Sequence, residues 1–290
     1  MIQSFLIQAL VTGGVYAMLA VGFALIFGVA RMINLAHTSF LMLAAYGMFY
    51  FTSRLGWNVG LAIITSLVGT TLIGLVSYKL FIDRIREHHV TVLLITIALA
   101  MVFQECMLLA FKAHFWTAPT LIVGYWVLFG VKISYQYLVV LAAAILVLIG
   151  IWALLSKTKL GIGIRATAQD TEVAGLMGIS VPRVLLITMG MATALAAIAG
   201  VVVAPLWTVH PYMWAGPLVM VMAIVVLGGL GSVKGSVIGA FIIAFVETSV
   251  VFWLPGGAFL SSAFALLVMV IILVVRPEGL YGIVFEEERL

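Results

Sequence analysis

The sequence predicts an all-α membrane protein with eight or nine transmembrane helices. Two observations carry this prediction. Of the 290 residues, 65% are hydrophobic and only 8% are charged, whereas charged residues make up about a quarter of an ordinary soluble domain. The apolar residues also form long continuous runs, unlike the alternating ten-residue segments of a membrane β-barrel. The whole chain, residues 1–290, is therefore expected to form a single transmembrane domain.

Nine apolar runs are candidates for the crossings, because a membrane helix needs about 20 mostly apolar residues. The second and the seventh runs are short, which leaves the number of crossings at eight or nine. One helix is expected to be broken or re-entrant near Asn34, where polar residues interrupt the pattern. The nine runs are residues 5–29, 40–52, 59–80, 92–111, 136–155, 184–204, 217–227, 236–252 and 261–275.

Lys and Arg residues alternate between the two sides of the predicted domain. They concentrate in residues 79–89, 156–183 and the tail after residue 275, and they are sparse in residues 112–134, 205–216 and 254–260. Connections rich in Lys and Arg stay in the cytoplasm, which predicts an external N-terminus and a cytoplasmic C-terminus. Arg54 is a mild exception on the outer side. Because the basic residues lie in loops between spans, the net charge of +4 does not indicate nucleic-acid binding.

Residues 156–183 form a polar island with six charged residues between two long apolar runs. The stretch from Arg165 to Ala174 has a composition compatible with a helix, and glycines flank it on both sides. This punctuation predicts a short helix that lies along the membrane surface. Two interpretations stay open at this point: a docking element for a partner, and an ordinary cytoplasmic loop without one.

The segment from Arg31 to Ser39 interrupts the apolar pattern between the first two runs. Asn34 is placed to cap a helix that starts within or near the membrane, and His37 and Thr38 follow it. Polar groups at membrane depth usually line a cavity or pair with one another. Asn34, His37 and Thr38 are therefore candidates for a solute path, and the alternative is a cytoplasmic turn whose Asn caps the second helix.

Glu105 and Glu247 are acidic residues well inside predicted spans. Either one is a candidate for lining a solute path or for relaying protons. The alternative is that each pairs with a backbone donor or lies near the outer interface. Cys106, the single cysteine, is expected to be a packing residue, and no metal-ligand spacing is present, so the sequence predicts no cofactor.

The glycine-rich stretch from Gly228 to Gly235 resembles a phosphate-binding loop in its glycine content only. It lacks the Gly-x-x-x-x-Gly-Lys-Ser/Thr order and follows a membrane span where a nucleotide site would follow a strand. We therefore predict a tight cytoplasmic turn that lets helices approach closely, with Gly228, Gly229, Gly231 and Gly235 as its packing residues.

Several segments together resemble the permease subunits of ABC importers for branched-chain amino acids, specifically the shorter of the two permease types. The resemblance covers nearly the whole chain, and its segments occur in the same order. They are Gly14-Val-Tyr-Ala-Met-Leu-Ala-Val-Gly-Phe, Asn34-Leu-Ala-His-Thr-Ser-Phe-Leu-Met-Leu-Ala-Ala-Tyr46, Gly163-Ile-Arg-Ala-Thr-Ala-Gln-Asp170 running to Gly175-Leu-Met-Gly-Ile179, Gly228-Gly-Leu-Gly-Ser232 with Gly235, and Arg276-Pro-Glu-Gly-Leu-Tyr-Gly282.

The resemblance implies a role for the polar island. In such importers a short cytoplasmic helix docks into a cleft on the ATP-binding subunit, and here the docking segment would run from Arg165 to Gly178. It further implies a bacterial inner-membrane location, ATP-binding subunits, an external solute-binding protein and a second related permease, with ATP hydrolysis on another polypeptide. The residues it assigns to ATPase coupling are Arg165, Gln169, Asp170, Glu172, Gly175 and Gly178.

One departure from the family pattern concerns the solute. Thr38 and Ser39 stand where relatives commonly have Gly-Glu, so a related solute such as another amino acid, urea or a short amide is an alternative to leucine, isoleucine or valine. A second alternative is an ion-coupled secondary transporter that uses Glu105 or Glu247. An intramembrane enzyme is not supported, because no catalytic constellation lies at a suitable depth.

Overall fold

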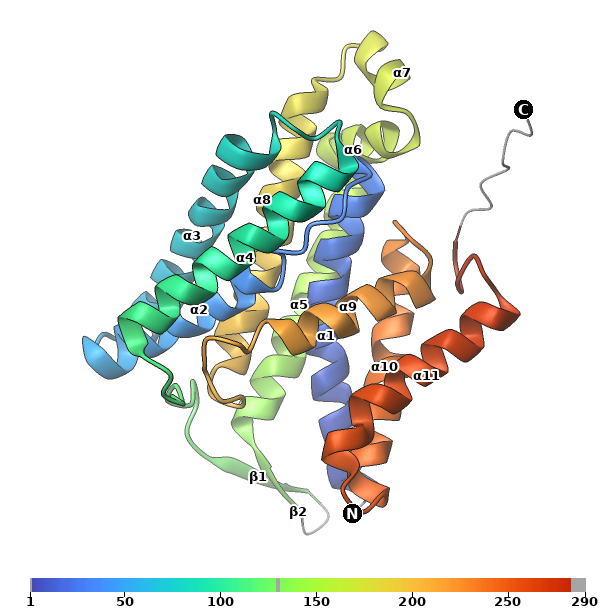
Figure 1. The fold of residues 1–290 in the computed structure, drawn as a ribbon. Coiled ribbons are helices and arrows are strands. Elements are labelled where there is room, and N and C mark those ends of the chain that lie inside the picture. Colours follow the sequence, from blue (N-terminus) through green and yellow to red (C-terminus); the bar gives the residue numbers. More distant parts are fainter. Residues whose placement is uncertain (1, 129–130, 283–290) are drawn as a thin grey trace.

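The computed structural model describes residues 2–128 and 131–282, which form a helical bundle with one small β-hairpin (Figure 1). In these residues seven helices are long and apolar enough to cross a membrane, in agreement with the predicted all-α membrane fold. Two further apolar helices, α2 and α9, are shorter. The long helices are α1 (Ile2–Ala30), α3 (Val59–Ser77), α4 (His89–Phe111), α5 (Tyr135–Lys157), α8 (Val181–Val203), α10 (Val233–Trp253) and α11 (Gly257–Val275).

The short helices are α2 (Ser39–Phe49), which continues into a π-helical turn η1 (Tyr50–Arg54), and α9 (Ala215–Gly228). At 1.5 Å per residue they span about 16 and 21 Å, less than the roughly 30 Å of a bilayer core. Each follows a non-helical segment. We call residues 31–38, before α2, the first break, and residues 204–214, before α9, the second break.

Two opposite ends of the bundle can be recognised from contacts between distant segments. At the hairpin end, β1 (Tyr125–Leu128) pairs antiparallel with β2 (Val131–Ser134), and Trp116 pairs with Val209 through backbone hydrogen bonds. At the α6–α7 end, α6 (Lys159–Gln169) packs on α1, α5 and α8, and α7 (Thr171–Leu176) projects beyond the bundle (Figure 1). Arg31 donates a hydrogen bond there to the carbonyl of Ala168.

The Lys- and Arg-rich connections share the α6–α7 end, as the alternation of basic residues predicts. The apolar side chains of Ile82 and Ile85, from the connection after α3, belong to one cluster with Val29 and Ile164. Arg54, the exception, lies at the hairpin end, where its guanidinium group sits 5.0 Å from the centre of the Trp116 ring. A cation over an aromatic face is stabilised in that position.

The order of elements repeats with inverted direction. A long helix, a break, a short helix and two more long helices occur as α1–α4, and the same order recurs as α8–α11. Helix α1 runs from the hairpin end to the α6–α7 end, whereas α8 runs the opposite way (Figure 1). The sequences of the two halves show no obvious similarity. Inverted repeats in transporters are often detectable only as weak internal symmetry.

Helices of each half pack on the central helix of the other half. The short helix α2 packs on α8, and α9 packs on α1; likewise α3 packs on α8, and α10 packs on α1. The pair α1 and α8 forms the buried centre, whereas α5 and α11 are peripheral. Each half thus completes the core of the other half, which places both breaks beside the central pair.

Two local predictions need correction. The stretch from Arg165 to Ala174 is not one helix, because α6 ends at Gln169 and α7 begins at Thr171. The intervening Asp170 has extended backbone and caps α7, which turns the chain between the two helices. Asn34 does not cap α2 either: the cap position is Thr38, without a side-chain hydrogen bond to the helix.

Candidate functional site

A cavity of about 550 Å³ opens at the second break. Three helices and the break itself build its wall, and α11 contributes one residue. The lining combines a carboxylate, hydroxyls, an imidazole and aromatic rings with apolar side chains. Its lining residues are Tyr16, Leu206, Trp207, Thr208, His210, Tyr212, Met213, Gly216, Pro217, Met220, Glu247 and Ser262.

Glu247, predicted from the sequence as a path residue, lies in this cavity on α10. The hydroxyl of Tyr16 on α1 donates a hydrogen bond of 2.9 Å to Glu247 Oε2. Tyr16 is buried, and Glu247 is half-buried. Because α1 and α10 pack along each other, the tyrosine holds the carboxylate at a fixed place in the wall.

No Lys or Arg among the described residues forms an ion pair with Glu247. The side-chain ion pairs among these residues are formed by Asp83, with Lys79 and Arg86, at the other end of the bundle. His210 lines the same cavity, and its ring meets the ring of Phe115 edge-on at 5.4 Å between centres. Partial burial lowers the pKa of His210 below its ordinary value of 6.5. The imidazole is therefore neutral near pH 7, and the cavity keeps the negative charge of an ionised Glu247 unbalanced.

The first break lies deep in the bundle and is closely packed. His37 Nε2 donates a hydrogen bond of 3.0 Å to the carbonyl of Leu19, which precedes the end of α1 by about 16 Å of helix. Asn34 Oδ1 accepts a hydrogen bond from the amide of Ala36, so the side chain caps a turn inside the break. This re-entrant course near Asn34 agrees with the prediction of a broken helix.

Asn34, His37 and Thr38 are all fully buried, and none of them lines any of the cavities described here. A methyl group on Gly22 would lie 2.8 Å from His37 Cε1, which shows how tightly the imidazole is enclosed. His37 Nδ1 and the Thr38 hydroxyl are buried without a hydrogen-bond partner. A place in the solute path therefore stays a prediction for Asn34, His37 and Thr38. It requires a conformation in which the first break opens.

Glu105 does not join the other candidates. It is exposed on the surface of α4, and its carboxylate accepts a hydrogen bond of 3.3 Å from Gln104. The neighbouring Cys106, expected to be a packing residue, is exposed as well, so that expectation is wrong. Gln104 in turn accepts a hydrogen bond of 2.9 Å from the indole of Trp214, where the second break ends. The sequence placed Glu105 at membrane depth. Only the structure shows that its side chain lies on the outer surface of the bundle.

Helix α7 projects beyond the bundle and exposes both charged and apolar side chains. Glu172 is exposed, and Val173, Leu176 and Met177 expose 53%, 82% and 78% of their surface. Asp170 Oδ1 accepts hydrogen bonds from the amides of Glu172 and Val173, at 2.8 and 2.9 Å. A carboxylate at this position satisfies amides that the first turn leaves unpaired.

The other residues predicted to couple to an ATPase surround α7 on both sides. Gln169 is the exposed last residue of α6, and Gly175 lies in α7. Gly178 has a φ of +84° and ends α7 with the left-handed conformation that favours glycine. Arg165 is exposed but faces a groove between α1, α5 and α10, so it lies apart from the tip of α7.

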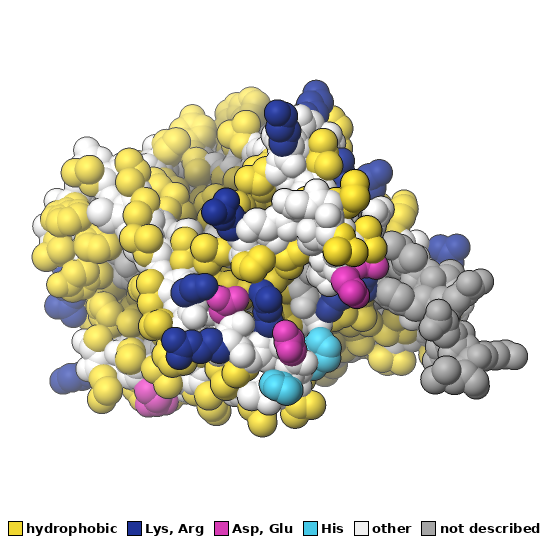
Figure 2. Space-filling model, turned by 90° about the horizontal axis from the view of Figure 1, so that it is seen from above, with side chains coloured by type: hydrophobic (Ala, Val, Ile, Leu, Met, Phe, Trp, Pro, Cys, Tyr) yellow, Lys and Arg dark blue, Asp and Glu magenta, His cyan; other side chains and the backbone are white. Residues whose placement is uncertain are grey.

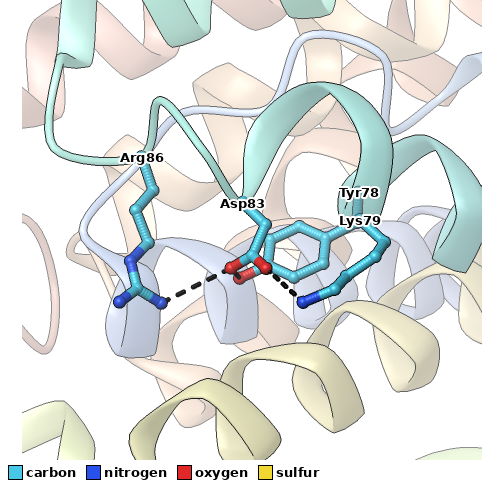
Figure 3. Close-up of polar contacts among 4 residues, drawn as sticks. All are labelled: Tyr78, Lys79, Asp83 and Arg86. Atoms are coloured by element: carbon cyan, nitrogen blue, oxygen red, sulfur yellow. Dashed lines mark hydrogen bonds and ion pairs between the residues drawn. The ribbon is translucent and has the colours of Figure 1, made fainter.

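Basic residues dominate this end of the molecule. Figure 2 shows Lys and Arg side chains spread over the face seen from above, with apolar side chains between them. Asp83 is held there between Lys79 and Arg86, at 2.6 and 3.6 Å, and also accepts a hydrogen bond from Tyr78 (Figure 3). Exposed cations along this end include Arg31, Lys79, Arg84, Lys157, Lys159, Arg165, Arg183, Lys234 and Arg276.

The glycine-rich turn joins α9 to α10 at the α6–α7 end. The backbones of Gly228 and Gly235 touch, and a side chain at either place would overlap the other residue. Gly229 and Gly231 have φ values of +99° and +83°, which L-residues with side chains rarely adopt. Gly231 also contacts the backbone of Gly28 in α1, so the turn fastens the second half to the central helix.

Sequence reasoning missed three groups of residues. Tyr16 was hidden in an apolar run, and Trp207 and Thr208 looked like part of an ordinary outer loop. The exposed Val173 and Leu176 of α7, and Met177 directly after it, carried a usable signal, since apolar residues in a polar island indicate a binding surface. Among the described residues, no group of three or more His, Cys, Asp or Glu side chains is placed to hold a metal ion.

Comparisons with known proteins agree with this architecture. A family profile described as "Branched-chain amino acid transport system / permease component" matches residues 5–273. The high-affinity branched-chain amino acid transport system permease protein LivH of Escherichia coli K12 is 28% identical over 93% of this chain and 92% of its own length. BraD of Pseudomonas aeruginosa, with the same description, is 26% identical over 96% and 94%.

Two solved structures share the fold at low sequence identity. One is an inward-facing conformation of a metal-chelate-type ABC transporter, with a TM-score of 0.55, 15% identity, and coverage of 93% of this chain and 85% of the other. The second is PsaBC from Streptococcus pneumoniae in complex with Fab, with a TM-score of 0.53, 14% identity, and coverage of 93% and 90%. At these identities the likeness concerns the fold.

Proposed function

Because this chain belongs to the family of permease components of branched-chain amino acid transport systems, we propose that it is a membrane subunit of an ABC importer. In this proposal the chain forms part of the path for branched-chain or closely related amino acids. Separate ATP-binding subunits drive the cycle from the α6–α7 end, and an external solute-binding protein delivers the solute at the hairpin end. The chain itself carries out no covalent chemistry.

The single observation that carries the proposal is the surface of α7. Val173 and Leu176 of α7, and Met177 directly after it, stay exposed on an element that projects beyond the membrane bundle (Figure 1). Exposed apolar side chains clustered on one projecting element mark a protein interaction site. A short amphipathic helix that enters a groove on a partner is a recurrent mode of recognition. Gln169, Asp170, Glu172, Gly175 and Gly178 complete the proposed contact, with Arg165 at its inner edge.

The contacts of α6 support a mechanical link from the partner to the core. Ile164 of α6 is buried in one cluster with Ile26 and Val29 of α1. Arg31 ties the start of the first break to Ala168, the penultimate residue of α6. When the ATPase subunits close on ATP, a displacement of α7 would therefore move α6, α1 and the first break together, as in rigid-body switching between two states.

The orientation of the chain follows from its charges. Placing the Lys- and Arg-rich α6–α7 end in the cytoplasm satisfies the positive-inside rule and puts the N-terminus outside in a bacterial inner membrane. The C-terminus then faces the cytoplasm. The cavity at the second break opens nearer the outer side in this orientation, where a solute-binding protein docks.

A second permease subunit accounts for the exposed face of α4. A carboxylate at membrane depth is costly against lipid, so it normally faces protein or water. Glu105 and Gln104 lie on this face. We propose that a related permease, or a second copy of this chain, covers α4 and that Glu105 faces the shared path. Asn34, His37 and Thr38 would reach that path only after the first break moves.

The decisive experiment is purification of this chain from its native membrane in mild detergent, followed by mass spectrometry. An ATP-binding subunit together with a second permease is the expected result. Glu172→Lys should remove the ATPase from the purified complex, because the substitution reverses a charge at the proposed contact. Glu87→Lys reverses a charge in a different exposed connection at the same end and should leave the complex intact. A homo-oligomer without any ATPase, reproduced after cross-linking, would refute the proposal.

The unpaired carboxylate of Glu247 is the observation that favours a second function, ion-coupled secondary transport. The two functions differ in their energy source. Uptake by an ABC importer stops without the ATPase and survives collapse of the proton gradient. A secondary carrier shows the opposite behaviour, so leucine uptake in vesicles with an uncoupler decides between them.

A further inference from the structure

We propose that Glu247 binds the ammonium group of the solute in the cavity at the second break. This inference rests on the proposed function and deepens it, since it names the part of the solute that the permease itself recognises. The site would take small primary ammonium compounds with an apolar body.

The charge of Glu247 favours an ammonium ligand. Glu247 is half-buried in the wall of a cavity at membrane depth, and every described Lys and Arg lies outside ion-pair distance from it. Taking a carboxylate out of water without a cation is costly. Carboxylates inside membrane domains therefore mark a pathway or pair with a partner that arrives with the solute. An ammonium group supplies that missing partner.

The hydrogen bonding of Glu247 leaves room for a donor in the cavity. Tyr16 donates its hydroxyl proton to Glu247 Oε2 at 2.9 Å, which leaves Oε1 without a partner among the described residues. An ionised carboxylate accepts several hydrogen bonds, whereas an ammonium group offers three donors and no acceptor. Oε1 is thus available to a donor in the cavity. The hydroxyls of Thr208 and Ser262 line the same space and make no hydrogen bonds within the described chain.

The rest of the cavity wall suits the apolar part of such a solute. Trp207 and Tyr212 bring aromatic rings to the cavity, and such rings attract cations as well as hydrocarbon. Leu206, Met213 and Met220 add apolar surface. One carboxylate beside an apolar wall suits an amphipathic solute whose charged end and hydrocarbon end are close together. A volume of about 550 Å³ holds such a solute together with water.

The test measures the charge of the cavity on the full-length chain in native membrane vesicles. Cys106→Ser removes the natural thiol, and Ser262→Cys places a reporter in the lining. Its reaction rate is compared for a cationic and an anionic methanethiosulfonate reagent of similar size. A focused negative charge should favour the cation by about tenfold or more. A reporter at Val123, an exposed site outside the cavity at the hairpin end, corrects for the intrinsic reactivity of the reagents.

Two variants separate charge from architecture. Glu247→Gln keeps the shape and the acceptor for Tyr16, so the preference should fall to that of the Val123 reporter. Tyr16→Phe removes the hydrogen bond but keeps the carboxylate, so the preference should persist. If the cationic preference is absent in the parent, or survives Glu247→Gln, the proposal is overturned.

Solute chemistry is tested by protection of the Ser262 reporter. The amine 3-methylbutylamine should slow its reaction, and the carboxylate 4-methylpentanoate should not, at matched ionic strength. Protection should vanish in Glu247→Gln. Equal protection by both compounds, or by sodium ions alone, would refute an ammonium site. These measurements need no ATPase, so loss of co-purification with intact protection refutes the importer and spares the site, whereas the reverse result refutes the site alone.

Discussion

The two breaks occupy equivalent positions in inverted halves, yet their surroundings are opposite. Each lies beside the central α1–α8 pair and contains a histidine. His37 of the first break is fully buried and bonded to the backbone of α1, whereas His210 of the second break lines an open cavity. One architecture therefore provides a packed joint in one half and a solute-sized chamber in the other.

The comparison teaches that the position of a broken helix does not by itself identify a binding site. Discontinuous helices at matching places in two repeats are the best general pointer to a transporter site. Here the two breaks have different roles in the proposal. The first is tied through Arg31 to Ala168 of α6, beside the segment proposed to contact an ATPase, and the second presents Glu247. Four matched pairs of substitutions test this contrast and the connection between the halves, in order of decreasing expected effect.

The largest effect is expected from removing the buried imidazole. His37→Ala deletes a hydrogen bond and empties a packed site, which costs about 2–5 kcal/mol. His210→Ala loses only a ring contact beside a cavity, so its cost should stay within about 1 kcal/mol. Thermal unfolding of the detergent-purified protein measures both changes. Equal destabilisation by the two variants would mean that the breaks are packed alike.

The next contrast uses two helical glycines. A methyl group on Gly200 of α8 would overlap the Leu41 carbonyl and touch Ala44, both in α2. Gly200→Ala should cost about 1–3 kcal/mol through overpacking. Gly216→Ala, in α9, meets no atom within 4 Å and should be neutral or stabilise by up to about 1 kcal/mol. The shift in melting temperature checks the difference in sign, and a destabilised Gly216→Ala would show that α9 is packed as tightly as α2.

A smaller and opposite pair of changes concerns two tyrosine hydroxyls. Tyr16→Phe removes the donor to Glu247 and should cost about 1–2 kcal/mol. The hydroxyl of Tyr46, in α2, is buried without a partner, so Tyr46→Phe should cost nothing or stabilise the protein. Chemical denaturation in detergent measures the two free energies of unfolding. A larger loss from Tyr46→Phe than from Tyr16→Phe contradicts the hydrogen bonding described here.

The smallest effect concerns the connection between the halves. Asp170→Ala removes the cap of α7 and should weaken that helix locally by about 0.5–2 kcal/mol, whereas Asp170→Asn retains an acceptor. Hydrogen exchange of the α7 amides should accelerate in the first variant alone. Acceleration throughout the bundle would show that α7 is coupled to global stability, contrary to its projecting position.

Much of the fold could be predicted from the sequence, because long apolar runs in a chain poor in charge have few structural solutions. All nine runs correspond to helices, and the broken helix near Asn34 is confirmed. The division of α6 and α7 was missed, although Asp170 followed by Thr and Glu is a recognisable start of a helix. The second break was not predicted, because residues 204–214 could not be distinguished from an ordinary connection on the outer side.

The candidate site was less predictable. Glu247 stood out as a charge inside an apolar run, but its partner Tyr16 lies 231 positions away in the sequence and carried no local signal. Asn34 and His37 had the same polar signature as a site, yet their environment is packed. Burial depends on contacts between the halves, and a single sequence does not reveal which residues those contacts enclose.

The contrast between the breaks is tested most directly by thiol accessibility at two matched threonines. The Cys106→Ser variant carries either Thr38→Cys or Thr208→Cys. Each variant is treated with a water-soluble, membrane-impermeant thiol reagent added from the hairpin side. Thr38 is fully buried and Thr208 is exposed. We expect rapid labelling at residue 208 and none at residue 38. Comparable labelling at both positions would contradict this expectation, because the first break would then be a water-filled path and not a packed joint.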